Sequence, residues 1–240
     1  MSIVYLNGEF IPSERATISP MDRGFLFGDG VYEVVPSYGG HLAAFEPHIR
    51  RLQNGLTELK MDSRMTSADW LKLATDLVRK NGAGNLGVYL HVSRGAEDRR
   101  FHAYPDHIDP TIFAYTFEIP TAPVAEKSSA LSLSCLTSED LRWKHCNIKS
   151  TALLGNVMHF QRAYAQNHDE VILFNEKKEI TEAAACNVFV VKDNVVVTPS
   201  LDYQKLPGIT RMLVLDILDR YSHFHVEERV VNLDEAFVAD

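Results

Sequence analysis

Residues 142–150 read Arg-Trp-Lys-His-Cys-Asn-Ile-Lys-Ser, so that Lys149 follows an apolar residue and precedes the apolar-rich segment 151–157. A lysine drawn toward a core loses the hydration of its ammonium group, and the free amine is the form that condenses with a carbonyl. Most lysines beside apolar segments instead keep their charge in water while the stem lies along the surface. Lys149 therefore marks a candidate site that needs support from the rest of the chain.

The composition of the 240 residues is that of an ordinary globular protein, with 45% hydrophobic and 23% charged residues. The formal net charge of -8, without a long basic run, argues against a nucleic-acid-binding protein. Cys135, Cys146 and Cys186 are widely spaced and form no CxxC pair, which predicts neither a disulfide framework nor a zinc site. Free thiols, with neither a signal-peptide pattern in residues 1–12 nor an apolar run of membrane-spanning length, predict a cytoplasmic protein.

Alternating and helical patterns in the first half predict a mixed structure. Asn7-Gly8 separates two short apolar runs and is typical of a tight β-hairpin. From Phe45 to Leu59 the apolar residues recur at spacings of three and four, which predicts an amphipathic helix with Arg51 at the margin of its apolar face. Further expected elements are a helix from Thr66, capped with Asp69 three residues on, to Asn81, and strands over 31–35, 86–93 and 111–119.

Residues 119–129 contain prolines and a polar run that interrupt the pattern, and they are predicted to link a first domain, 1–118, to a second, 130–240. A helix that begins Gly208-Ile209-Thr210-Arg211 presents free amides, which form a natural anion site. The other elements expected in the second domain are strands over 131–136, 171–174, 180–191 and 195–198 and a helix from about 151 to 166.

Five motifs together resemble the fold-type IV, or class IV, pyridoxal-phosphate enzymes. They are Gly28-Asp29-Gly30-Val31-Tyr32-Glu33, His48-Ile49-Arg50-Arg51-Leu52, Ile148-Lys149-Ser150, Thr181-Glu182 with Asn187-Val188-Phe189, and Gly208-Ile209-Thr210-Arg211. The resemblance covers nearly the whole chain. It is greatest to the D-amino acid aminotransferases, because residues 30–35 and the pair Arg100-x-His102 are features of that group rather than of branched-chain aminotransferases. It implies an α/β (α+β) fold of two domains with pyridoxal 5'-phosphate between them in a homodimer.

The same resemblance implies roles for single residues. Lys149 would be the catalytic residue, bonding to the cofactor and then moving a proton to and from the substrate α-carbon. Glu182 would lie against the pyridine nitrogen and keep it protonated, so that the ring accepts electrons. The implied phosphate and ring contacts come from Arg51, Leu206, Ile209 and Thr210.

The substrate carboxylate would be bound by Tyr32 together with Arg100 and His102 of the neighbouring subunit, which would select the D enantiomer. A desolvated carboxylate needs a cation or several hydrogen-bond donors, which these side chains supply. The loop at 95–100 is one residue longer than in close relatives, so Arg99 is an alternative to Arg100. Either arginine could also pair with Glu97 or Asp98.

Two departures from the family pattern affect the cofactor. Residues 183–186 are Ala-Ala-Ala-Cys where the family commonly has Gly-Ser-Ser-Ser, so hydroxyl groups near the cofactor are replaced. The family pattern also continues beyond residue 240 into a Ser/Thr-rich phosphate-binding turn. If the molecule ends at residue 240, one arm of the phosphate contacts is missing and weaker cofactor binding is expected.

The leading interpretation is a transaminase that moves the amino group of a D-amino acid to a 2-oxo acid. A pyridoxal-phosphate lyase of the aminodeoxychorismate type is the main alternative. Branched-chain-type and (R)-amine transaminases share the fold and also stay open, as does a cofactor-binding protein without activity. The Arg100-x-His102 pair favours the leading interpretation over the lyase.

Overall fold

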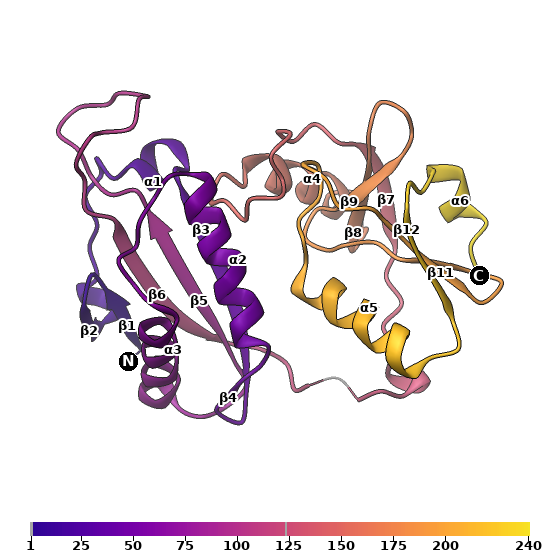
Figure 1. Ribbon diagram of the computed structural model, residues 1–240, viewed down its shortest axis with the longest axis horizontal. Coiled ribbons are helices and arrows are strands. Elements are labelled where there is room, and N and C mark those ends of the chain that lie inside the picture. The colour runs from indigo at the N-terminus through magenta and orange to yellow at the C-terminus, as the bar shows by residue number, and fades with distance from the viewer. Residues whose placement is uncertain (1, 123) are drawn as a thin grey trace. The chain divides into compact units, whose positions relative to one another are not determined.

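The computed structural model describes residues 2–122 and 124–240, which form two compact units (Figure 1). The first unit comprises the chain up to Ser129 together with Ile148–Ala152, and the second comprises Ala130–Asn147 and Leu153–Asp240. Helices and sheets occur in both units, which confirms the expected mixed fold class. That residues 119–129 act as a linker between domains 1–118 and 130–240 stays a prediction. The short segment around Lys149 belongs to the first unit although its neighbours on both sides belong to the second.

The first unit contains a six-stranded sheet in the order β2-β1-β6-β5-β3-β4, and every neighbouring pair is antiparallel. Its elements are β1 (Ile3–Leu6), β2 (Glu9–Pro12), η1 (Ser13–Arg15), α1 (Arg23–Phe27), β3 (Gly30–Tyr38), β4 (His41–Leu42), α2 (Phe45–Glu58), α3 (Ser67–Asn81), β5 (Leu86–Ser93), β6 (Thr111–Glu118) and η2 (Lys127–Ser129).

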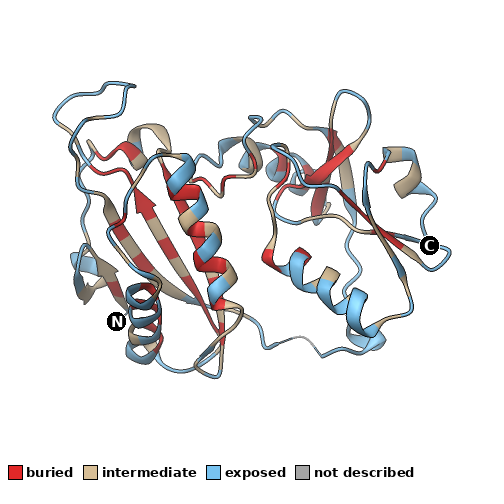
Figure 2. Ribbon diagram, in the orientation of Figure 1, coloured by how far each residue is buried: buried red, intermediate tan, exposed pale blue. Residues whose placement is uncertain are grey.

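Helices α2 and α3 cover one face of this sheet and enclose the main core with it (Figure 1). Burial alternates along β3 and β5, as the red and tan bands of Figure 2 show, because successive side chains of a strand point to opposite faces. Ile49 and Leu52 of α2 and Trp70 and Leu77 of α3 are almost fully buried in this core. The apolar spacings of both helices therefore correctly predicted the faces that pack on the sheet.

Two local signals in the first unit are confirmed. Asn7 and Gly8 both have positive φ, of 48° and 105°, and join β1 to β2 as a tight hairpin. Thr66 and Asp69 form a reciprocal capping box: the Thr66 side chain accepts a bond from the Asp69 amide, and the Asp69 carboxylate accepts one from the Thr66 amide at 2.9 Å.

The segment Ile148–Ala152 is hydrogen-bonded to the beginning of β3. The Tyr32 amide donates to the Lys149 carbonyl at 3.0 Å, and the Thr151 amide donates to the Gly30 carbonyl at 3.0 Å. The Thr151 hydroxyl also donates to the Gly28 carbonyl at 3.1 Å. Because these backbone groups already have partners at β3, the helix expected from about residue 151 begins only at Leu154.

The second unit contains two three-stranded sheets, β7-β8-β9 and β10-β11-β12, each with one parallel and one antiparallel pair. Its elements are β7 (Cys135–Glu139), α4 (Leu154–Tyr164), β8 (Glu170–Phe174), β9 (Ile180–Ala183), β10 (Val190–Lys192), β11 (Val195–Pro199), α5 (Ile209–Tyr221), β12 (His225–Arg229) and α6 (Leu233–Phe237).

The single strand expected over 180–191 is two strands in the structure, β9 and β10. A turn in which the Ala183 amide donates to the Cys186 carbonyl ends β9, and the Asn187 side chain then bonds to other parts of the unit rather than to a sheet. Asp193 and Asn194, with φ of 48° and 68°, connect β10 to β11 as predicted. Among the described residues, no helix is both long and apolar enough to cross a membrane.

Replacing Thr66 with alanine should lower the free energy of unfolding by about 1 kcal/mol, because the change leaves the Asp69 amide, in the first turn of α3, without its side-chain acceptor. Urea denaturation followed by circular dichroism measures this difference. Lys72→Ala on the exposed face of the same helix is the matched control, since it removes a single surface ion pair with Asp76 and should cost only about 0.3–0.5 kcal/mol. Equal losses in the two variants would contradict the role of the capping box.

Candidate functional site

Lys149 lies beside an aromatic group on the face of the first unit's sheet that α2 and α3 do not cover. Its Nζ atom is 4.2 Å from the centroid of the Tyr32 ring, which offers its negative face to a cation. Tyr32 stacks on Tyr89 at 5.5 Å, and the Tyr89 hydroxyl is 3.1 Å from Nδ1 of His91. Burial raises the pKa of Tyr89 to about 12 and lowers the pKa of His91.

The sequence identified Lys149 and Tyr32 as candidate site residues but not Tyr89 and His91. The alternating pattern of a strand does not distinguish these two residues from residues of the core.

Arg51 is held by a fully buried carboxylate in the first unit. Its Nε and Nη2 atoms donate to the two oxygens of Glu33 at 2.6 and 2.8 Å, and Nδ1 of His48 is 2.8 Å from the same carboxylate. Burial alone would raise the pKa of Glu33, but Arg51 and His48 hold it below its usual range. A bidentate contact, in which two nitrogens bond to the two carboxylate oxygens, fixes the plane of the guanidinium group. Arg51 therefore has a defined orientation, as an anion-binding arginine requires.

Arg100 and His102 lie on the exposed loop between β5 and β6, and both contact the ring of Phe27 on α1. The Arg100 guanidinium carbon is 4.9 Å from the centroid of that ring, and the imidazole of His102 is 5.3 Å from it. Arg99 instead lies over the ring of Phe101, at 4.7 Å. Glu97 pairs with Arg23, and among the described residues neither Arg99 nor Arg100 forms an ion pair.

Glu182 is a buried carboxylate on β9 of the second unit, surrounded by hydrogen-bond donors. Nη1 of Arg142 donates to one oxygen at 2.6 Å, while the Leu206 amide and the Asn187 side-chain amide donate to the other at 2.9 and 3.2 Å. Burial raises the pKa of Glu182, and the bonds to Arg142 and to the Leu206 amide act in the opposite direction. Asn187 also donates to the Leu206 carbonyl at 3.0 Å, so it ties the Glu182 carboxylate to this loop.

Arg142 bridges Glu182 to a second carboxylate, Asp140. Its Nε and Nη2 atoms donate to the two Asp140 oxygens at 3.0 and 2.8 Å, and the Thr181 hydroxyl donates to Asp140 at 2.8 Å. Arg142 holds the pKa of Asp140 below its usual range against the opposing effect of burial. The roles of Arg142 and Asp140 were missed in the sequence, because two opposite charges two residues apart are typical of a solvated loop.

The first turn of α5 carries the amides that are predicted to bind an anion. The helix begins at Ile209 after Gly208, and no side-chain hydrogen bond caps this end. A Cβ atom at position 208 would collide with the Asn187 side-chain oxygen, so a larger residue would have to displace a side chain that bonds to Glu182 and to the Leu206 carbonyl. The amides of Ile209 and Thr210 therefore lie on a helix start that any larger residue at position 208 would disturb.

These groups fit the parts of pyridoxal 5'-phosphate in their chemistry. Lys149 offers an amine for the aldehyde, Glu182 a buried carboxylate for the pyridine nitrogen, and the start of α5 amides for the phosphate. Lys149 and Arg51 belong to the first unit, whereas Glu182, Leu206, Ile209 and Thr210 belong to the second.

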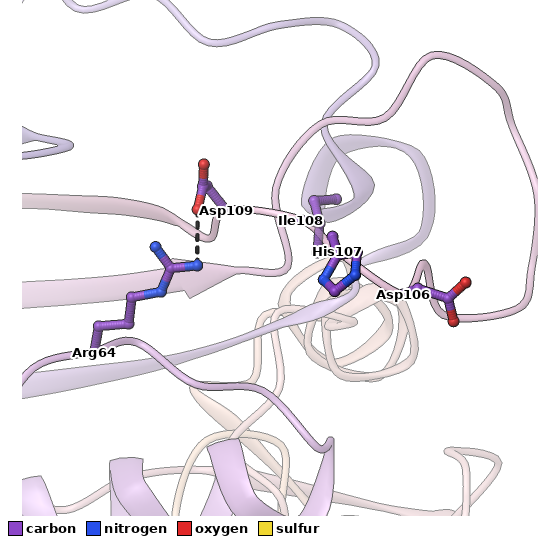
Figure 3. Close-up of a pocket in the computed structure, with 5 residues that line it drawn as sticks. All are labelled: Arg64, Asp106, His107, Ile108 and Asp109. Atoms are coloured by element: carbon purple, nitrogen blue, oxygen red, sulfur yellow. Dashed lines mark ion pairs between the residues drawn. The ribbon is translucent and has the colours of Figure 1, made fainter.

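A polar hollow lies on the first unit, lined by residues other than this set (Figure 3). Arg64 forms an ion pair with Asp109 at 2.9 Å, and both side chains are mostly exposed. The other lining residues are Asp106, His107 and Ile108, from the same β5–β6 loop that carries Arg100. The hollow contains none of the predicted site residues.

Comparisons with known proteins agree on one family. The sequence profile described as amino-transferase class IV matches residues 30–240. The chain is 37% identical over 237 residues to a D-alanine aminotransferase of Bacillus licheniformis, and the match covers 99% of this chain and 82% of that relative. A D-alanine aminotransferase of Listeria monocytogenes is 36% identical over 214 residues, covering 89% of this chain and 73% of the relative.

A solved structure supports the fold. The branched-chain aminotransferase of the thermophilic archaeon Thermoproteus uzoniensis, solved with norvaline, superimposes with a TM-score of 0.86 at 21% identity. The match covers 100% of this chain and 81% of that chain. At this identity the likeness establishes the fold and not the substrate.

Replacing Arg142 with methionine should lower the free energy of unfolding by about 3–5 kcal/mol at neutral pH, because two buried carboxylates lose their shared cation. Without Arg142, burial raises the pKa of Asp140 and of Glu182 above their values in the unfolded chain, which are about 4. The loss should therefore be complete at neutral pH and shrink as the pH falls toward 4, where both groups take up protons.

Urea denaturation at several pH values measures the effect, and Arg162→Met, which changes an exposed arginine, is the control. A loss independent of pH would indicate that packing rather than charge is responsible.

Proposed function

This chain belongs to the class IV aminotransferases, which are pyridoxal 5'-phosphate enzymes, and we propose that it moves the amino group of a D-amino acid to a 2-oxo acid. D-Alanine and D-glutamate are the proposed donors. The proposal is carried by the 37% identity over 237 residues to a protein named D-alanine aminotransferase. Solved structures of a branched-chain aminotransferase and of a protein described as an aminodeoxychorismate lyase share the fold with this chain at 21% identity, which does not select the substrate.

The cofactor, when bound, accepts the electron pair that is released as the bond from the substrate α-carbon to hydrogen breaks. We propose that Lys149 is the group that takes this proton from the substrate α-carbon and delivers it to C4′ of the cofactor. Tyr32 supports that role, because its ring lies 4.2 Å from the lysine Nζ atom and its backbone holds the Lys149 carbonyl. A general base needs this kind of fixed position within reach of the proton it moves.

Glu182 would hold a proton on the pyridine nitrogen, where a buried carboxylate favours the positive charge. Arg142 and the Leu206 amide support this role, because they orient both carboxylate oxygens. Leu206 would pack on the ring. Arg51 would bind the phosphate together with the amides of Ile209 and Thr210 and the Thr210 hydroxyl.

The substrate carboxylate would be bound by Tyr32 with Arg100 and His102. In the proposed homodimer, the loop of one subunit supplies Arg100 and His102 to Tyr32 of its neighbour, as the family resemblance implies. The contacts of Arg100 and His102 with one ring, that of Phe27, support their action as a pair. The cytoplasm is the proposed location, since Cys135, Cys146 and Cys186 are free thiols.

The direct test supplies purified protein and pyridoxal 5'-phosphate with 2-oxoglutarate and either D-alanine or L-alanine, and measures pyruvate and glutamate. Faster turnover of D-alanine is expected. A preference for L-alanine would contradict the proposed stereochemistry, and pyruvate release from aminodeoxychorismate without transamination would favour the lyase.

Lys149→Ala should abolish turnover and leave the melting temperature nearly unchanged, because the change removes the proton-moving amine while the partly buried side chain contributes little packing. Retained binding of the cofactor would be compatible with this result, since the phosphate and ring contacts stay in place. Turnover at the unmutated rate would exclude the proposed role. Lys178→Ala, which changes a lysine on an exposed turn, is the control.

Arg100→Ala should raise KM for D-alanine strongly, by an amount equivalent to about 2 kcal/mol, because the carboxylate loses a charged hydrogen-bond donor. Arg99→Ala should have little effect, since Arg99 lies over Phe101 instead. Steady-state kinetics of both variants with both alanine enantiomers measure the difference. A larger defect in Arg99→Ala would transfer the role to that residue.

A further inference from the structure

Helix α1 is firmly attached to the sheet of the first unit although it has only five residues. Asp22, which is buried before its first turn, accepts bonds from the Gly24 amide at 2.8 Å, the Ser93 hydroxyl at 2.7 Å and the Thr111 hydroxyl at 2.6 Å. Ser93 ends β5 and Thr111 begins β6. The helix is therefore anchored at the two strand ends from which the β5–β6 loop departs.

Arg23 of α1 holds the backbone of that loop. Its buried guanidinium group donates to the Phe101 carbonyl at 2.6 Å and to the His102 carbonyl at 3.2 Å, and it forms ion pairs with Asp29 and Glu97. The Arg23 amide also donates to the Gly95 carbonyl at 2.8 Å. The loop thus meets α1 at several points on either side of Arg100, although the side chains of Arg100 and His102 are exposed.

Phe27, at the end of the same helix, presents its ring to three side chains. The guanidinium carbons of Arg23 and Arg100 are each 4.9 Å from its centroid, and the ring of His102 is 5.3 Å away. Arg100 therefore has a specific aromatic contact and no competing ion pair among the described residues. A long exposed arginine would otherwise populate many rotamers, and a ring beneath its planar group limits them.

We propose that Phe27 is a positioning residue, whose ring orients Arg100 and His102 toward a single anionic group, the carboxylate of the amino-acid substrate. Arg23 fixes the backbone of the pair, and Phe27 fixes the direction of the two side chains. Arg99 has no part in this arrangement, because it lies over Phe101. The inference rests on the proposed function for the identity of the anion, whereas the ordering of the loop by Phe27 does not depend on it.

The test compares three variants of the cofactor-loaded protein. Phe27→Leu removes the ring but keeps an apolar side chain, Phe27→Tyr restores a ring, and Phe25→Leu is the matched control on the same helix, where the side chain is 70% exposed. Phe27→Leu should raise KM for D-alanine about three- to fivefold, the factor that corresponds to an exposed cation–π contact. Its kcat should stay within about twofold, because Lys149 is untouched. Phe27→Tyr should restore KM, and Phe25→Leu should not change it.

Two further measurements separate positioning from general damage. In an Arg100→Ala background the effect of Phe27→Leu on KM should shrink, because the guanidinium group that the ring orients is already gone. Hydrogen–deuterium exchange should become faster for residues 96–104 in Phe27→Leu but not in Phe25→Leu. Equal KM values for Phe27→Leu and the unmutated protein, or an undiminished effect in the Arg100→Ala background, would overturn the inference.

Failure of the proposed function has a different signature. The unmutated protein would then not turn over D-alanine, while the exchange comparison would still decide whether Phe27 orders the loop. Faster exchange confined to Phe27→Leu would support the positioning role, and identical exchange in Phe27→Leu and Phe25→Leu would overturn it.

Discussion

The hydrogen bond from the Tyr32 amide to the Lys149 carbonyl is the contact on which the position of Lys149 beside the Tyr32 ring depends. It is joined by a bridge between Val31 and Ser150 and by the bond from Thr151 to Gly30. Together they attach the segment Ile148–Ala152 to β3 and bring the lysine side chain to the Tyr32 ring. A loop lysine without such backbone bonds would sample many positions, which a proton-transferring group cannot do efficiently.

Buried charge is the second constraint, and each unit satisfies it with an arginine. In the first unit Arg51 and His48 compensate Glu33, and in the second Arg142 compensates both Glu182 and Asp140. Removing water from a carboxylate costs several kcal/mol unless donors replace it, so these clusters must form as complete sets. The same requirement makes them rigid. The proposed roles of Arg51 at a phosphate and of Glu182 at a pyridine nitrogen would require charges held in this way.

The β5–β6 loop follows the same principle in a more exposed setting. Arg94, at its start, donates twice to Asp29 and once to the Leu59 carbonyl, while Arg23 donates to Asp29 and to loop carbonyls. Asp29 thus joins Arg94, the first residue of the loop, to Arg23, which donates to two carbonyls of the loop. The backbone is restrained while the Arg100 and His102 side chains stay accessible, a combination that suits a substrate-binding loop.

The sequence by itself determined the features that depend on local chemistry and on motif order. The Asn7-Gly8 hairpin, the capping box of α3, the apolar faces of α2 and α3 and the identity of the family could all be read from it, because each depends on neighbouring residues or on a pattern of motifs. The roles proposed for Lys149, Glu182 and Arg51 came from the same motifs. Only the tertiary structure revealed Arg142 as the partner of Glu182, Glu33 as the partner of Arg51, and Phe27 beneath Arg100 and His102. Those partners are 40, 18 and more than 70 residues apart along the chain, and no local pattern encodes which distant side chains a fold will bring into contact.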